Sequence, residues 1–122
     1  MKYLGLVWAG VYVQDLETSI SFYQNTLGLP LLGQGTDWAH FDSGAGTLLE
    51  LFTGGTSARE PKKPHQQSIV VGLRVDDLDE AVARLQEKGV SFNPGESGEF
   101  EGTRWAHFTD PEGNQLEVKE MP

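Results

Sequence analysis

Two glutamates and two histidines stand at matching places in a sequence that repeats itself. Glu50 and Glu117 each lie between aliphatic residues, as Leu-Glu-Leu and Leu-Glu-Val, and His40 and His107 each lie within Trp-Ala-His-Phe. Carboxylates and imidazoles transfer protons, bind divalent metal ions and pair with cationic ligands. Because both sets recur with the same spacing, the sequence predicts that they belong to one functional surface.

The alternation of side chains along a strand assigns these residues to one face of a sheet. Their immediate neighbours are apolar and are expected to lie against helices, which leaves the opposite face to the polar and aromatic residues. That face is predicted to carry Trp8, Gly10, Tyr12, Trp38, His40 and Glu50 from one half and Val70, Gly72, Arg74, Trp105, His107 and Glu117 from the other. A face open to water does not usually carry three tryptophans, whereas the wall of a ligand cavity does. We expect the histidines on a strand next to the glutamates but at a different height.

A helix is predicted after the first strand of each half. One apolar stripe consists of Leu16, Ile20, Tyr23 and Leu27 and ends at Gly28, and the other consists of Leu78, Val82 and Leu85 and ends at Gly89. Asp15 and Asp77 precede the stripes as N-cap residues, and Asp77 with Glu80 has the spacing of a capping box. Each half therefore reads as a strand, a helix and three further strands.

The element boundaries follow from the repeat and from turn residues. The predicted first strands are 7–13 and 68–75, the second strands are 31–34 and 90–93, and turns at 42–46 and 110–114 join the last two strands of each half. The loop 93–102 is the expected place of a short insertion. We expect one domain over residues 1–122, with modules at 5–53 and 68–120. The linker 54–67 is expected to be a solvated connector or, as the alternative, a basic patch around Arg59, Lys62 and Lys63.

The composition excludes several classes of function. The chain has 122 residues, no cysteine and a net charge of −9. Disulfides, thiol catalysis and Cys-bound metals are therefore excluded, and nucleic acid and anionic membranes are disfavoured as partners. The longest apolar run, residues 4–13, is far shorter than the roughly 20 residues that cross a bilayer. We expect a soluble, cytoplasmic protein.

Several segments resemble one known family. They are the Val-x-Asp-Leu entries to both helices, Ser21–Tyr23, Leu27–Leu29 and Asp110–Asn114. Together with the tandem strand-helix-three-strand halves, they resemble the vicinal oxygen chelate superfamily of glyoxalase I, bleomycin resistance proteins and extradiol dioxygenases. The resemblance implies an α+β fold in which two tandem βαβββ modules form curved mixed sheets that enclose a cavity. It also implies a homodimer.

The resemblance implies a metal site that this sequence does not complete. Enzymes of the family hold their ion with a His or Gln on the first strand of a half and with a Glu on the last strand. The glutamates match as Glu50 and Glu117, but the first-strand positions hold Trp8 and Val70, which cannot coordinate a metal. Two carboxylates without imidazole make a poor site for Fe, Ni, Mn or Zn, so we expect no cofactor.

We therefore expect a protein that binds a small cationic or aromatic molecule through charge pairing and cation–π stacking, without metal catalysis. The expected contacts are Trp8, Tyr12, Trp38, His40, Glu50, Arg74, Phe100, Trp105, His107 and Glu117, with Phe100 on a lid at 95–102 and Arg74 facing a ligand carboxylate. Two alternatives stay open. One is a metal-dependent lyase, isomerase or dioxygenase that uses Glu50, Glu117, His40 and His107. The other is a structural or interaction domain whose cavity is filled by its own tryptophans.

Overall fold

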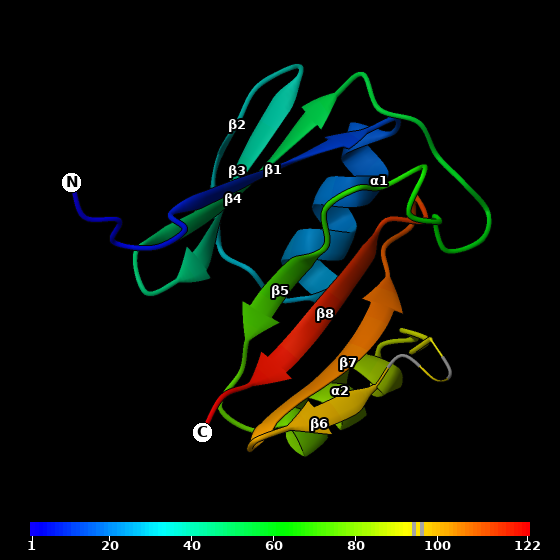
Figure 1. Ribbon diagram of the computed structural model, residues 1–122. Helices are drawn as coiled ribbons and strands as arrows, with labels where there is room; N and C mark the ends of the chain where they lie inside the picture. Colours follow the sequence, from blue (N-terminus) through cyan, green and yellow to red (C-terminus); the bar gives the residue numbers. More distant parts are fainter. Residues whose placement is uncertain (94, 96) are drawn as a thin grey trace. The chain divides into compact units, whose positions relative to one another are not determined.

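The computed structural model describes residues 1–93, 95 and 97–122 and divides the chain into two units, Met1–Ser57 and Ala58–Pro122 (Figure 1). The first unit runs through β1 (Trp8–Val13), α1 (Leu16–Ser21), a π-helical turn (Phe22–Thr26), β2 (Leu31–Gln34), β3 (Trp38–Gly44) and β4 (Thr47–Thr53). Its sheet has the order β1-β4-β3-β2, in which β1 is parallel to β4 and the other pairs are antiparallel. Strand β4 therefore has a neighbour on each side.

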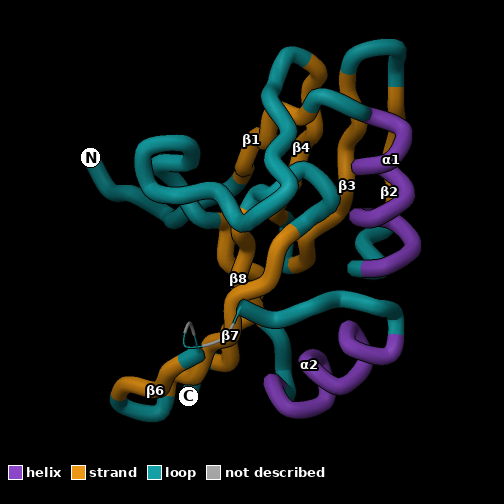
Figure 2. The backbone as a smooth tube through the Cα atoms, turned by 90° about the vertical axis from the view of Figure 1, so that its right-hand side faces the viewer, coloured by secondary structure: helices purple, strands orange, loops and turns teal. Residues whose placement is uncertain are grey.

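The second unit repeats this order. It consists of β5 (Val71–Arg74), α2 (Leu78–Glu87), β6 (Gly98–Phe100), β7 (Thr103–Thr109) and β8 (Gln115–Glu120), with the sheet order β5-β8-β7-β6. Each helix packs against its own sheet, α1 against β4 and α2 against β7 and β8 (Figure 2). The predicted α+β fold of two βαβββ modules is confirmed. In the part of the chain that the structure describes, no helix has both the length and the apolar character needed to cross a membrane.

The predicted alternation of buried residues is confirmed on the last two strands of each unit. The buried residues are Ala39, Phe41, Leu49 and Leu51 in the first unit and Ala106, Phe108, Leu116 and Val118 in the second. Tyr23, which follows α1, is fully buried, and its ring lies 6.0 Å from that of Phe41. The residues between these apolar positions are left on the opposite face, which is the face predicted to carry the functional side chains.

Two aspartates cap the helices as predicted. The side chain of Asp15 accepts a hydrogen bond from the backbone N–H of Thr18 at 3.1 Å, and that of Asp77 accepts one from Glu80 at 3.0 Å. The second half of the predicted capping box is wrong, because Glu80 turns its carboxylate to Arg84 at 2.8 Å rather than back to Asp77. An i,i+4 ion pair on the helix surface has replaced the reciprocal cap.

The prediction of a strand at 90–93 in the second unit is wrong. Phe92 forms only an isolated bridge with Phe108, and the second strand of this unit is β6. Strand β6 takes up part of the segment predicted as a lid, of which Glu96 lies outside the described residues. Measured from the Trp-Ala-His-Phe segments, β6 is the counterpart of β2, so the insertion lies between α2 and β6.

The linker is not solvated throughout, and Lys62 does not belong to a basic surface patch. Lys62 is 6% exposed, and its Nζ donates a hydrogen bond to Oδ1 of Asn114 at 2.7 Å. Its backbone N–H donates to the carbonyl of Gly113 at 2.9 Å. Asp110 holds the turn itself by accepting from the backbone N–H of Asn114 at 2.9 Å. The linker is thus folded onto the turn 110–114.

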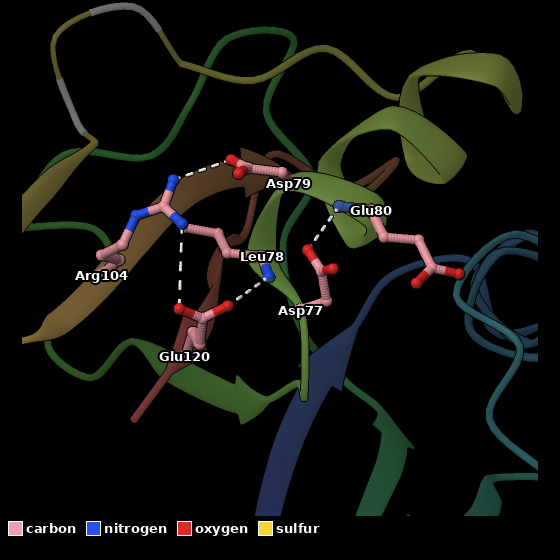
Figure 3. A network of polar contacts seen from close by, with 6 residues as sticks. All are labelled: Asp77, Leu78, Asp79, Glu80, Arg104 and Glu120. Atoms are coloured by element: carbon pink, nitrogen blue, oxygen red, sulfur yellow. Dashed lines mark hydrogen bonds and ion pairs between the residues drawn. The ribbon is translucent and has the colours of Figure 1, made fainter. Parts of the chain in front are cut away.

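A polar network fastens the start of α2 to its sheet (Figure 3). The guanidinium of Arg104 on β7 bonds Asp79 at 2.7 Å and lies 3.8 Å from Glu120 of β8, and Glu120 accepts from the backbone N–H of Leu78 at 2.9 Å. The hydrogen bond and the charge of Arg104 lower the pKa of Asp79 below its usual value. Since Asp79 is exposed, this ion pair orients the helix and adds little stability.

Gly113→Ala is expected to destabilise the protein more than the matched change Gly28→Ala. Both glycines have positive φ, +81° and +77°, which costs an L residue about 1 kcal/mol. A Cβ at Gly113 would also lie 2.8 Å from the carbonyl oxygens of Ala58 and Glu60, whereas one at Gly28 meets nothing within 4 Å. Urea unfolding should show a loss of about 1 kcal/mol for Gly28→Ala and about 2 kcal/mol or more for Gly113→Ala. Equal losses would contradict the packing of the linker on this turn.

Candidate functional site

Glu50 lies at the centre of the first sheet. Strand β4 places it directly across from His40 of β3 and Gly10 of β1. Its Oε1 accepts a hydrogen bond from the indole Nε1–H of Trp8 at 2.9 Å, and its Oε2 lies 3.0 Å from Nε2 of His40. The side chain of Glu50 is 15% exposed, so the carboxylate is largely withdrawn from water but can still be reached from it.

Gly10 allows Trp8 to reach that carboxylate. The two residues are two positions apart on β1 and therefore face the same way. The Trp8 ring lies over Gly10, where a Cβ would be 2.4 Å from Cη2 of the indole. Any larger residue at position 10 would push the ring away from Glu50, which is why a glycine is needed inside this strand.

Aromatic rings lie beside both hydrogen-bonding partners of Glu50. The ring of Phe52 lies 6.1 Å from that of Trp8 and 5.6 Å from that of Tyr12, and the ring of Trp38 lies 4.8 Å from the imidazole of His40. When His40 is neutral, both hydrogen-bonding partners of Glu50 are uncharged. The cluster then keeps one negative charge within an aromatic frame, an arrangement suited to a cation.

Glu117 occupies the equivalent place in the second sheet but has different partners. It lies across from His107 of β7, and its Oε2 is 2.7 Å from Nε2 of that histidine. Its Oε1 pairs with Nζ of Lys119 at 2.8 Å, and the same ammonium lies 5.5 Å from the ring centroid of Trp105. Glu117 is therefore paired with a lysine of its own unit, whereas in the described part of the chain Glu50 has an indole and an imidazole as partners and no lysine or arginine.

The prediction that the histidines lie at a different height from the glutamates is wrong. In both sheets the antiparallel register places histidine and glutamate directly opposite each other, His40 with Glu50 and His107 with Glu117. Alternation along a strand assigns a residue to a face but does not give its partner on the next strand, because register depends on the geometry of the connecting turn.

The remaining predicted contacts lie at exposed positions. Tyr12 is on β1 and Arg74 is the last residue of β5. Val70, which was predicted on the same face but not as a contact, directly precedes β5. Phe100 ends β6 across from Thr103 and is 67% exposed. Of these, Tyr12 is joined to the Glu50 cluster through the ring of Phe52. The two clusters are thus formed by Trp8, Trp38, His40 and Glu50 in the first unit and Trp105, His107 and Glu117 in the second.

Sequence reasoning missed two members of these clusters, Phe52 and Lys119. Each follows its glutamate by two residues and so faces the same side of the sheet. Phe52 supplies an aromatic neighbour in the first cluster, and Lys119 supplies a cation in the second. The spacing along the strand is the signal that identifies both.

The donor set of neither cluster fits a metal ion. Each cluster offers one imidazole and one carboxylate. Across residues 1–93, 95 and 97–122, no three His, Cys, Asp or Glu side chains gather into a group that could hold an ion. A divalent transition metal normally takes three or more protein ligands, so neither cluster supplies enough ligands by itself.

A hollow of about 550 Å³ lies between α2 and strands β6 and β7 of the second unit. Leu78, Val82 and Phe92 contribute apolar surface to it, and Arg104 contributes a cation. The hollow also has acidic and aromatic lining residues, Asp79, Glu99 and Trp105, but its guanidinium already pairs with Asp79 at 2.7 Å, whereas no lysine or arginine of the described residues pairs with Glu50. We therefore take Glu50 as the centre of the candidate site.

Two βαβββ units, each with a four-stranded mixed sheet and a glutamate on its last strand, define a protein of the glyoxalase-like class. The sequence profile of the Glyoxalase/Bleomycin resistance protein/Dioxygenase superfamily matches residues 5–118. The chain belongs to this superfamily.

Three relatives illustrate the range of this superfamily. The chain is 35% identical to the uncharacterized protein YraH of Bacillus subtilis (strain 168), over 89% of this chain and 92% of YraH. It is 30% identical to the metallothiol transferase FosB of Lysinibacillus sphaericus (strain C3-41), over 86% of this chain and 74% of FosB. The crystal structure of TnmS3, an antibiotic binding protein from Streptomyces sp. CB03234, is similar with a TM-score of 0.74 and 31% identity over 100% of this chain and 99% of TnmS3.

Gly10→Ala is expected to break the hydrogen bond between Trp8 and Glu50, because the new Cβ would lie 2.4 Å from the Trp8 ring. One of the three indole N–H resonances in a ¹H–¹⁵N spectrum should then shift. Gly33→Ala is the matched control, since its Cβ would lie 3.7 Å from the Trp38 ring, an ordinary contact. If the indole resonances stay in place in the Gly10 variant, the assigned position of Trp8 is wrong.

Proposed function

We propose that the first unit binds a small molecule in which a cationic nitrogen is attached to an aromatic or apolar body, and that it does so without metal catalysis. Glu50 pairs with the cation, and the tryptophans contact the apolar body. The observation that carries the proposal is the environment of Glu50, a carboxylate that is 15% exposed and held by an indole N–H and an imidazole within an aromatic frame.

The charge of Glu50 explains why a cation is preferred over a neutral ligand. A charge withdrawn from water is costly unless it is paired. Trp8 and His40 occupy part of the hydrogen-bonding capacity of the carboxylate, which accepts at about four lone-pair positions. Lone-pair positions of the carboxylate therefore remain for an ammonium, and a nearby indole face adds roughly 0.5–2 kcal/mol of cation–π attraction. The net charge of −9 favours the approach of a cation.

The relatives support small-molecule binding in general terms. TnmS3 is an antibiotic binding protein and FosB is a metallothiol transferase, so both a binding protein and an enzyme are similar to this chain. Binding is the better proposal here because the positions that the resemblance assigns to nitrogen or amide ligands of a metal hold Trp8 and Val70.

A metal-dependent enzyme is the second candidate, favoured by the 3.0 Å approach of His40 to Glu50 and by the likeness to a metallothiol transferase. Metal analysis of protein purified without chelator separates the two candidates. Stoichiometric Fe, Ni, Mn or Zn that is lost in Glu50→Ala would overturn binding without a metal. Protein that binds an amine in the absence of metal would support the proposal.

We also propose that the protein is a homodimer, with the segment before β1 covered by the second copy. Met1, Tyr3, Leu4 and Leu6 in this segment are between 84% and 106% exposed. Covering such a row of apolar side chains with another surface is favourable, by about 25 cal/mol for each Å² removed from water.

Replacing Leu4 and Leu6 together with serine is therefore expected to lower the dimer fraction. Light scattering coupled to size-exclusion chromatography over a dilution series measures that fraction. The matched control replaces the exposed Leu32 of β2 with serine and should leave the fraction unchanged. A wild-type protein that is monomeric at every concentration contradicts the proposed dimer.

Glu50→Gln is expected to weaken the binding of phenylbutylamine at least about tenfold, equivalent to about 1.4 kcal/mol, because it removes the charge and keeps the size of the side chain. Isothermal titration calorimetry at neutral pH measures the affinity. Glu17→Gln, at an exposed position of α1, is the control variant, and phenylbutyrate is the control ligand of opposite charge. The proposal fails if the wild type does not bind the amine or if Glu50→Gln binds it equally well.

A further inference from the structure

The repeat that relates the two glutamates also relates Phe52 to Lys119. Both residues follow their glutamate by two positions and face the same side of their sheet. Both also pair with a tryptophan on the neighbouring strand, Phe52 with Trp38 and Lys119 with Trp105. Each sheet therefore presents a tryptophan, a histidine and a glutamate in the same register, and the two sheets differ in the residue beside the carboxylate.

Lys119 shows how such a cluster accommodates a cation. Its ammonium lies 2.8 Å from Oε1 of Glu117 and 5.5 Å from the ring centroid of Trp105, while His107 holds the other carboxylate oxygen at 2.7 Å. The side chain of Lys119 is 35% exposed, so the cation is partly desolvated. A carboxylate, an indole and an imidazole together hold one alkylammonium.

In the first unit the position that corresponds to Lys119 holds Phe52, so the same three groups have no lysine at that place. Phe52 is uncharged, and Oε1 of Glu50 accepts the neutral N–H of Trp8 at 2.9 Å. Within the described residues, no lysine or arginine forms an ion pair with Glu50. The negative charge that Lys119 neutralises in the second unit is left for another molecule to neutralise in the first.

We propose that Lys119 is an internal counterpart of the ligand, so that the first unit takes from solution the primary alkylammonium that the second unit supplies itself. The inference rests on the proposed function and narrows its ligand to a primary amine on an apolar stem. It also assigns one site to each chain, at Glu50, because the Glu117 cluster is already filled.

Hydrogen-bond donors distinguish a primary amine from other cations at this site. A primary ammonium has three N–H donors to offer the carboxylate, as Lys119 does to Glu117. A trimethylammonium group keeps the cation–π attraction but has no N–H to donate. The trimethylated form of phenylbutylamine is therefore expected to bind at least about tenfold more weakly than the primary amine, and equal or tighter binding would overturn the inference.

An exchange of the two residues tests the inference directly. In calorimetric titrations with phenylbutylamine, the wild-type chain should bind one equivalent. Phe52→Lys should bind at least about tenfold more weakly than the uncharged variant Phe52→Met, because both lose the aromatic ring but only the lysine places an ammonium beside Glu50. Lys119→Met should gain a second equivalent, and the added change Glu117→Gln should remove it again.

The outcomes separate this inference from the proposed function. Unchanged affinity in Phe52→Lys relative to Phe52→Met overturns the inference, and so does binding of only one equivalent by Lys119→Met. In either case the proposed function stands if amine binding by the wild type depends on Glu50. A wild type that does not bind the amine overturns the proposed function itself. Thermal unfolding establishes that each variant is folded. If Phe52→Lys does not fold, Lys119→Met decides the matter, because that side chain is partly exposed and its loss leaves the core intact.

Discussion

A carboxylate on an interior strand of a sheet has to be satisfied by the side chains beside it. Strands β4 and β8 each have a neighbour on both sides, so Glu50 and Glu117 are surrounded by other strands and are only 15% exposed. Gly72 on β5 makes room for Glu117, since a Cβ there would lie 3.0 Å from its Oε1, and Gly10 on β1 makes room for the ring of Trp8, which bonds Glu50. The tryptophans, histidines and lysine on this face are arranged around that requirement.

Stability alone does not account for two carboxylates at these positions. A buried ion pair roughly breaks even against apolar side chains of similar volume, because desolvation offsets the attraction between the charges. The surrounding residues, Ala39, Leu49, Ala106 and Leu116 among them, are already apolar and buried on the other face. By this argument a leucine at position 50 would be no less stable, so the charge of Glu50 is better explained by a molecule that it binds, whereas Glu117 is paired with Lys119.

Periodicity was enough to predict the helix and strands of the first unit and which side chains share a face of each sheet, because it reports which side of an element a residue occupies. It was not enough for register, which is why the pairing of His40 with Glu50 came only from the structure. Strand β6 was missed because Gly98 reads as a turn residue, although it forms a close contact with Trp105, where a Cβ would lie 2.6 Å from the ring. The burial of Lys62 depends on Asn114, a partner far along the chain that no local pattern reveals.

The two units depart in different ways from the metal site that the family resemblance implies, and both departures leave a carboxylate to be compensated without a metal. A histidine or glutamine on the first strand of a half offers an electron pair to an ion, whereas Trp8 in its place offers an N–H to Glu50 at 2.9 Å. Val70 offers neither, and in that unit Lys119 brings its own cation to Glu117 at 2.8 Å. An ammonium is a complete charge match for a carboxylate, but an indole N–H is only a dipole. The carboxylate beside Trp8 therefore keeps more of its negative charge than the one beside Lys119, and the proposal that a cationic ligand binds at Glu50 rather than at its counterpart rests on that difference.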